Sequence, residues 1–307
     1  MTSVDPASFE LLVLFDVVTI LSFALIALIL ATAYCSKHVH LRKAWYGQMV
    51  QWMIYCMSYM LLFGFQEGTE PPRSLCLFQA SLIYACPPAC AVGSTCFIID
   101  FYMSTSLLHK NPTLKMPKLE ILFISLPWIT LTGTALQVVL FTVANQKFDA
   151  VRRSPGCFLC NISDPEPTIV SVTLVLLALI VWFYYEVQSG IIMYRNRLEY
   201  AGFSYKAARK YLSLYIRSAI LTVGMAVGTA ISIWALSSSS RRFGMGTWSV
   251  ALPFMPIFVA LVFGTQEDIM RVWMFWKKRT PEEDSGFKAQ SSLTFVEMLL
   301  PNSTLVV

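Results

Sequence analysis

Three charged residues interrupt long apolar stretches of the sequence and are the first candidates for chemistry. Asp100, Glu186 and Arg217 each lie seven to ten residues from a flanking basic residue, which is about 10–15 Å along a helix. A charge that faces lipid is costly, so such residues usually face the interior of a helix bundle and pair there. We predict that Arg217 bridges Asp100 or Glu186 and holds one face of the protein closed. The alternative is that Arg217 reaches lipid headgroups while the two acids meet water separately.

Three cysteines are candidates for covalent cross-linking at the opposite side of the apolar stretches. Cys76 begins the third stretch, and Cys157 and Cys160 lie in the longest loop, residues 144–167. An extracellular location permits disulfides. We predict a bond from Cys76 to either Cys157 or Cys160, with a local Cys157–Cys160 bond as the alternative. The remaining five cysteines are interpreted as small apolar residues: Cys35, Cys56, Cys86, Cys90 and Cys96.

The same loop carries a glycosylation motif. Asn161 begins Asn-Ile-Ser, which matches the N-glycosylation acceptor pattern. A second match begins at Asn302, but it falls in a predicted cytoplasmic tail, where we expect it to stay unmodified. Asn161 is therefore the predicted glycan site.

The sequence does not place potential catalytic residues in the positions that known catalytic sites require. The three histidines, His38, His40 and His109, lie in predicted loops or at helix ends, whereas an intramembrane metal hydrolase needs ligands inside the bundle. Residues 247–264 contain no lysine, which excludes a retinal Schiff base on that segment. We find no phosphate loop, nucleophile elbow or basic aromatic-rich face for nucleic acid. We expect neither an enzyme nor a bound metal or cofactor.

The composition predicts that these residues are positioned by membrane-spanning helices. Of the 307 residues, 56% are hydrophobic and 13% are charged, whereas soluble domains carry about 25% charged residues. Most of the apolar segments reach the length of about 20 residues that a spanning helix needs. We predict an all-α integral membrane protein, a bundle of seven transmembrane helices. The predicted spans are 11–34, 45–65, 75–108, 119–143, 168–194, 211–236 and 247–264.

Two spans carry further features. The third span contains Pro87 and Pro88 and is the longest, so we interpret it as the kinked central helix. Gly224 and Gly228 form a GxxxG pattern in the sixth span, which indicates close contact with another helix. Asp16 lies about two turns into the first span, either as a polar contact in a ligand cavity or simply at the membrane interface.

Basic residues set the expected orientation. Sixteen of the 23 Lys and Arg residues fall on one side of the predicted spans and six on the other. The positive-inside rule then predicts that residues 1–10 are extracellular and that the C-terminus is cytoplasmic. We expect a multi-pass protein of the plasma membrane. Residues 265–279 read as a short amphipathic helix at the membrane interface, in contact with lipids. Residues 280–307 are predicted to be a disordered cytoplasmic tail.

Two segments of the sequence resemble a known family. One is FVALVFGTQEDIMRVW, from Phe258 to Trp273. The other is the third span, with Cys76 at its start and Tyr102 near its end. With seven spans and an extracellular N-terminus, they resemble the G-protein-coupled receptors. Within that class they are similar to the fungal lipopeptide pheromone receptors of the a-factor type and their orphan relatives in mushroom-forming fungi. Asp100-Phe101 stands where that family has a basic pair.

The resemblance implies a receptor that senses an extracellular ligand and signals to a heterotrimeric G protein. Candidate ligand-lining residues, chosen by depth and residue type, are Gln79, Tyr84 and Trp248. The alternative is a small-solute transporter or channel of seven-helix type. Such carriers usually show repeated triple-helix units and polar sites at the middle of the membrane, whereas here the charges cluster towards one side.

Overall fold

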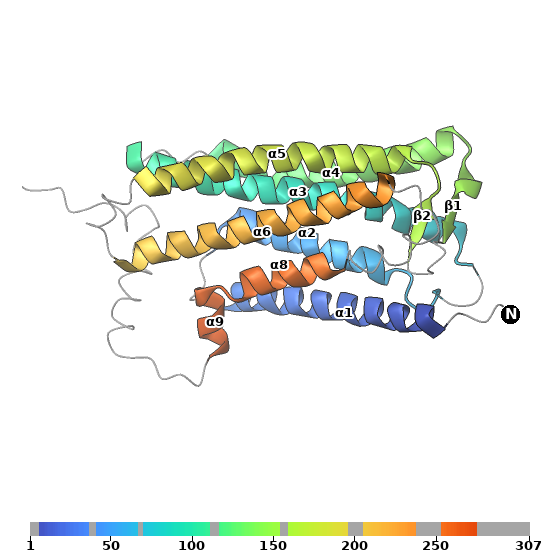
Figure 1. The fold of residues 1–307 in the computed structure, drawn as a ribbon, viewed down its shortest axis with the longest axis horizontal. Helices are drawn as coiled ribbons and strands as arrows, with labels where there is room; N and C mark the ends of the chain where they lie inside the picture. Colours follow the sequence, from blue (N-terminus) through green and yellow to red (C-terminus); the bar gives the residue numbers. More distant parts are fainter. Residues whose placement is uncertain are drawn as a thin grey trace, which may run out of the picture.

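The computed structural model describes residues 6–36, 41–66, 70–110, 117–153, 159–195, 205–237 and 253–274, and is 86% helical (Figure 1). Three predicted features, Cys157, Trp248 and the tail 280–307, lie outside these described residues. The helices are α1 (Pro6–Cys35), α2 (Lys43–Met60), α3 (Arg73–Lys110), α4 (Pro117–Ala144), α5 (Glu166–Arg195), α6 (Tyr205–Ser237), α8 (Phe254–Gly264) and α9 (Glu267–Trp273).

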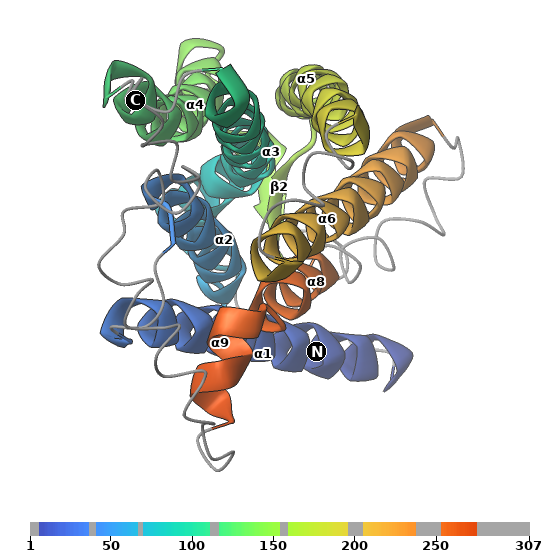
Figure 2. The same cartoon turned by 90° about the vertical axis from the view of Figure 1, so that its left-hand side faces the viewer.

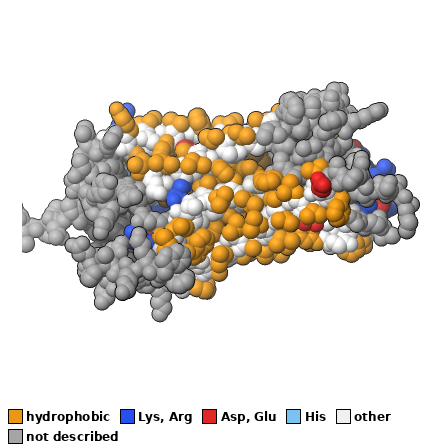
Figure 3. Space-filling view, turned by 60° about the horizontal axis from the view of Figure 1, so that its bottom comes forward, with side chains coloured by type: hydrophobic (Ala, Val, Ile, Leu, Met, Phe, Trp, Pro, Cys, Tyr) orange, Lys and Arg blue, Asp and Glu red, His pale blue; other side chains and the backbone are white. Residues whose placement is uncertain are grey.

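The composition of the helices confirms an all-α protein suited to a membrane. Five helices, α1, α3, α4, α5 and α6, are long and apolar enough to cross a bilayer. Large hydrophobic side chains face outwards on them, such as Ile129 at 61% and Ile180 at 66% exposure. Hydrophobic side chains also cover most of the visible middle of the bundle in Figure 3. Because such a surface is unfavourable in water, it fits a lipid environment.

The helices run alternately up and down and give the bundle two different ends (Figures 1 and 2). One end, which we call the hairpin end, carries the start of α1 and a small β-hairpin. The other, which we call the elbow end, carries the turn from α8 into α9. Residues far apart in the sequence therefore meet at each end.

The third predicted span is the central helix, as expected. α3 packs against α2, α4 and α5. Its apolar window is 72% buried, compared with 39% or less for the other four candidate spans. Small buried residues flank Pro87 and Pro88 within α3, including Ala85, Ala89 and Ala91. Small side chains let neighbouring helix backbones approach closely, which suits a helix surrounded on several sides.

The second predicted span ends earlier than its composition suggests. We predicted 45–65, but α2 ends at Met60 and a turn follows over residues 61–64. Within this turn Gly64 adopts a positive φ of 84°, a backbone conformation that favours glycine and that a continuing helix does not have. The seventh predicted span, 247–264, is described from residue 253, where α8 covers Phe254–Gly264.

The long loop 144–167 holds structure that the sequence analysis missed. A short 3₁₀ turn (η1, Phe148–Ala150) precedes β1 (Val151–Arg153), which pairs antiparallel with β2 (Cys160–Ile162). Val151, Cys160 and Ile162 are buried together with Leu62 of the turn after α2 and with residues of α3 and α4. This buried face turns the hairpin into a cap on one end of the bundle.

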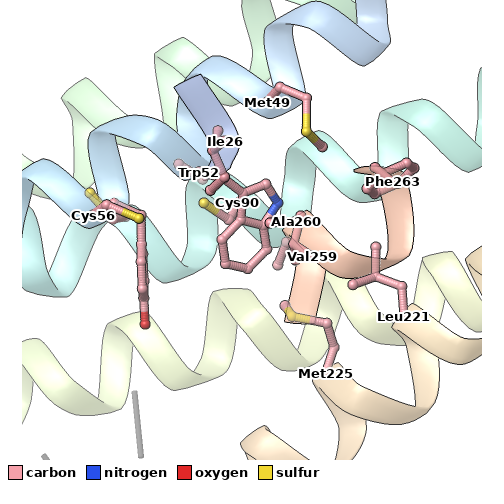
Figure 4. Close-up of a cluster of buried hydrophobic side chains, with 14 of the residues drawn as sticks. Ile26, Met49, Trp52, Cys56, Cys90, Leu221, Met225, Val259, Ala260 and Phe263 are labelled. Carbon is pink, nitrogen blue, oxygen red and sulfur yellow. The ribbon is translucent and has the colours of Figure 1, made fainter. Parts of the chain in front are cut away.

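The main core joins α1, α2, α3, α5, α6 and α8. Figure 4 shows side chains from several of these helices meeting between them, including Trp52 of α2, Leu221 and Met225 of α6, and Val259 of α8. Gly224 of α6 explains the close approach, because a Cβ atom there would meet the ring of Phe258 on α8. The predicted helix contact at the GxxxG pattern is confirmed, with α8 as the neighbour.

Candidate functional site

Arg217 lies near the elbow end of α6 and binds the end of α8. Its guanidinium donates hydrogen bonds to the carbonyl of Val262 and to the carbonyl and hydroxyl oxygens of Thr265, the last two at 2.7 Å. The last carbonyls of an α-helix have no partner within the helix, so they are natural acceptors for an arginine. Ser213, one turn earlier on α6, accepts a further bond from Nε at 3.3 Å. The side chain thus fastens α6 to the turn between α8 and α9.

Helix α9 and the end of α8 are attached to α1. The indole Nε1 of Trp273 donates a hydrogen bond to Thr32 Oγ1 at 3.0 Å. Ile269 is fully buried, and Gly264 lies so close to Ile29 that a Cβ atom would be 2.9 Å from its Cδ1. Within the predicted segment 265–279 the structure has a short helix, α9 (Glu267–Trp273), which packs on α1; residues after 274 lie outside the described part, and a position at the membrane interface stays a prediction.

Asp100 has a different cationic partner from the one we predicted. Its carboxylate forms a salt bridge with Arg42, just before α2, at 2.6 Å. Arg42 also donates to the carbonyl oxygen of Asp100 at 3.3 Å. The next residue, Lys43, pairs with Glu120 of α4 at 3.4 Å. These two pairs join the elbow ends of α2, α3 and α4.

Glu186 also lies away from Arg217. It is 5% exposed on α5 and accepts a hydrogen bond from Thr222 Oγ1 of α6. The predicted cluster of Asp100, Glu186 and Arg217 is therefore wrong. The three residues lie at similar depths, but each points to a different neighbour, because depth along a helix does not fix the direction of a side chain around it.

The hairpin end is closed by a covalent bond. A disulfide joins Cys76 of α3 to Cys160 of β2, one of the two bonds that we predicted from Cys76. Arg153 of β1 donates to the carbonyls of Phe65 and Gln66, at 3.0 and 3.2 Å. The hairpin is thus tied to both α3 and the segment that follows α2.

Two predicted ligand-lining residues serve this cap instead. Gln79 is fully buried; its Nε2 donates to the carbonyl of Ser58 at 3.1 Å, and its Oε1 accepts from the backbone N–H of Cys160 at 2.9 Å. The hydroxyl of Tyr84 exchanges hydrogen bonds with the backbone of Ile162, at 3.3 and 3.4 Å. Their polar groups are therefore used within the protein, because β2 lies where we expected a ligand.

Asp16 and Asn161 complete the predicted residues at this end. Asp16 accepts a hydrogen bond from Gln66 Nε2 at 2.7 Å, which links α1 to the segment after α2. Asn161 lies in β2 between the buried Cys160 and Ile162 and is only half-buried. Alternate residues of a strand face opposite sides, so Asn161 points away from the core, as a glycan acceptor must. Its modification stays a prediction.

Other polar contacts escaped the sequence analysis altogether. Gln48 of α2 donates to Ser94 of α3 at 2.7 Å, and Thr95 of α3 donates to the carbonyl of Ala178 on α5 at 3.0 Å. Both pairs are buried. The polar residues within the second and third spans could have indicated these contacts, since such side chains usually form hydrogen bonds between helices in a membrane.

Comparison of the sequence with models of known protein families and with curated proteins finds no match. The geometry therefore carries the functional argument. The hairpin end is held by a disulfide and backbone hydrogen bonds, whereas α6 is held at the elbow end by the side-chain bonds of Arg217. Such an arrangement can keep one end fixed while α6 changes position at the other.

Proposed function

We propose that the chain is a receptor of the G-protein-coupled type with seven transmembrane helices, located in the plasma membrane. The hairpin end and the N-terminus face the outside, and the elbow end faces the cytoplasm. The five long apolar helices support a membrane location, with α2 and the segment ending in α8 as the two further crossings. The excess of basic residues in the loops at the elbow end supports this orientation.

In this proposal an extracellular ligand acts at the hairpin end and a heterotrimeric G protein binds at the elbow end. A lipopeptide pheromone is the ligand class suggested by the resemblance of the third span and of residues 258–273 to fungal receptors. Ligand binding favours one of two arrangements that the free receptor already populates. The cap formed by β1 and β2 is the element through which the ligand acts on α3.

The contact between Arg217 and the end of α8 carries the proposal. It acts as a brake that holds α6 against α8 and α9 and keeps the cytoplasmic end closed. Charge-assisted hydrogen bonds of this kind contribute about 1–3 kcal/mol net. An energy difference of that size shifts a two-state equilibrium about 5–150-fold. Removing the guanidinium should therefore raise the population of the open state without any ligand.

The test is a guanine-nucleotide exchange assay with purified fungal Gα subunits and the full chain in nanodiscs. We expect basal exchange to increase in the order wild type, Arg217→Lys, Arg217→Leu, because lysine replaces only part of the bonding. Arg152→Leu is the matched control, since Arg152 is exposed at the hairpin end and binds only nearby backbone there. Exchange equal to that of the wild type in folded Arg217→Leu would refute the brake. If no folded variant supported exchange and the wild type carried solutes across liposomes, the receptor proposal would fail.

A further inference from the structure

We propose that the buried contact between α5 and α6 around Glu186 is a binding site for a monovalent alkali cation. Glu186 is 5% exposed, and one carboxylate oxygen, Oε2, accepts the hydrogen bond from Thr222. The other oxygen, Oε1, is buried without a hydrogen-bond partner. A buried carboxylate oxygen needs a partner, because its removal from water is otherwise uncompensated.

Two more side chains converge on the same carboxylate. Ser218, 3% exposed, and Trp182, 1% exposed, lie within interaction range of Glu186, yet Ser218 Oγ and Trp182 Nε1 have no partner at hydrogen-bond geometry. Ser218 and Thr222 are four residues apart on α6 and so share one face of that helix. Trp182 is four residues before Glu186 on α5. Four side chains from two helices therefore surround one point, and three of their polar atoms are unpartnered.

No positive side chain among the described residues forms an ion pair with Glu186. Arg217 is the neighbour of Ser218 in the sequence, but its guanidinium binds Val262 and Thr265 instead. Among the described residues, the other titratable group facing Glu186 is Tyr215, which is uncharged at neutral pH. If Glu186 is ionised, its buried charge needs a charged partner nearby to offset its desolvation. A bound cation would provide that partner.

The chemistry of the atoms selects the type of cation. Glu186 Oε1, Ser218 Oγ and the lone pairs of Thr222 Oγ1 are hard oxygen ligands, which suit alkali or alkaline-earth ions. A single carboxylate balances one positive charge. Within the described residues no group of three or more His, Cys, Asp or Glu side chains is placed to hold a metal ion, which argues against a divalent or transition-metal site.

The experiment measures thermal unfolding of the full chain in nanodiscs in NaCl, KCl or N-methyl-D-glucamine chloride at equal ionic strength and fixed pH. Binding to the folded state raises the melting temperature, by roughly 3 °C at ten times the dissociation constant. We expect this rise with Na⁺ or K⁺ in the wild type and its loss in Glu186→Gln and Ser218→Ala. Thr229→Ala is the control, because Thr229 is also buried on α6 but bonds only to its own helix.

Equal melting temperatures in all three salts would overturn the site, as would a rise that persists in Glu186→Gln. A melting temperature that depends on pH through Glu186 but not on the cation would assign the site to a proton and also overturn it. If Glu186→Gln does not fold, ²³Na NMR line broadening by the wild type, absent with Ser218→Ala, supports the site; no broadening by the wild type refutes it. These outcomes are independent of G-protein coupling, so either proposal can fail alone.

Discussion

The guanidinium of Arg217 binds both the backbone carbonyl and the hydroxyl of Thr265, each at 2.7 Å, although the residues are 48 positions apart. One side chain of α6 thereby satisfies acceptors just beyond the end of α8. The main-chain acceptors would remain after any side-chain change at position 265, whereas a change of Arg217 removes every bond at once. The two residues therefore contribute unequally to the same contact.

This difference predicts which of two variants loses more of the free energy of unfolding. Thr265→Val should lower the free energy of unfolding by about 1 kcal/mol, because it removes one hydrogen-bond acceptor. Arg217→Leu should lower it by about 1–3 kcal/mol, because it leaves carbonyls at the helix end unpaired. Thermal unfolding in nanodiscs measures both. Thr265→Val with the larger effect would show that the hydroxyl, rather than the helix end, is the main partner.

The salt bridge between Arg42 and Asp100 should be worth more than an exposed one. Its two side chains are 43% and 22% exposed, and the bond length is 2.6 Å. A double-mutant cycle with Arg42→Ala and Asp100→Ala should give a coupling of about 1 kcal/mol, at the upper end for surface pairs. The matched control is Arg73 with Asp149, 76% and 82% exposed, whose coupling should be near zero. Equal couplings in the two cycles would contradict the expectation.

Two glycine-to-alanine substitutions should differ in their effect on stability, because one glycine lies in a packed helix contact and the other does not. A Cβ atom at Gly224 would collide with the ring of Phe258, so Gly224→Ala should destabilise the protein by about 1–3 kcal/mol. At Gly133 of α4 a Cβ atom meets nothing within 4 Å, so Gly133→Ala should be neutral or slightly stabilising through helix propensity. The two melting temperatures relative to the wild type test this. A neutral Gly224→Ala would mean that α6 and α8 are not closely packed there.

Much of the fold is predictable from sequence because long apolar segments leave few alternatives. The expected span 75–108 is α3, Arg73–Lys110, and the span 168–194 is α5, Glu166–Arg195. The end of α2 was missed because Leu61, Leu62 and Phe63 continue the apolar pattern, whereas their backbone forms a turn that ends at Gly64. The hairpin was missed because its strands have three residues each, too few for a recognisable alternation.

The partners of the charged residues could not be predicted from the same pattern. Equal depth suggested that Arg217 meets Asp100 or Glu186, but a helix turns by about 100° per residue, so neighbours at one depth can point in any direction. The partner of Asp100 is Arg42, one of the sixteen basic residues from which we predicted only the orientation. The pairing depends on how α2 and α3 pack, which one sequence does not contain.

The double hydrogen bond of Gln79 predicts a structural role for this residue. Gln79→Leu should destabilise the protein by about 1–3 kcal/mol for each buried group left unpaired, chiefly the backbone N–H of Cys160. Gln137→Leu is the control, since the amide oxygen of Gln137 is buried without a partner and its loss should cost little. If Gln79→Leu kept the wild-type melting temperature, Gln79 would not anchor β2, and a role in ligand binding would regain weight.

Asn161 and Asn302 together provide a test of orientation within one chain. Only sequons on the outer side of the membrane meet the glycosylation machinery, which acts on surface segments of secreted or exported regions. After expression in a eukaryotic host, we expect glycosidase treatment to increase the gel mobility of the wild type. That shift should vanish in Asn161→Gln, which removes a side chain facing away from the core, and persist in Asn302→Gln. The reverse pattern would place the tail outside and invert the proposed receptor, with Arg217 and the end of α8 then facing the exterior.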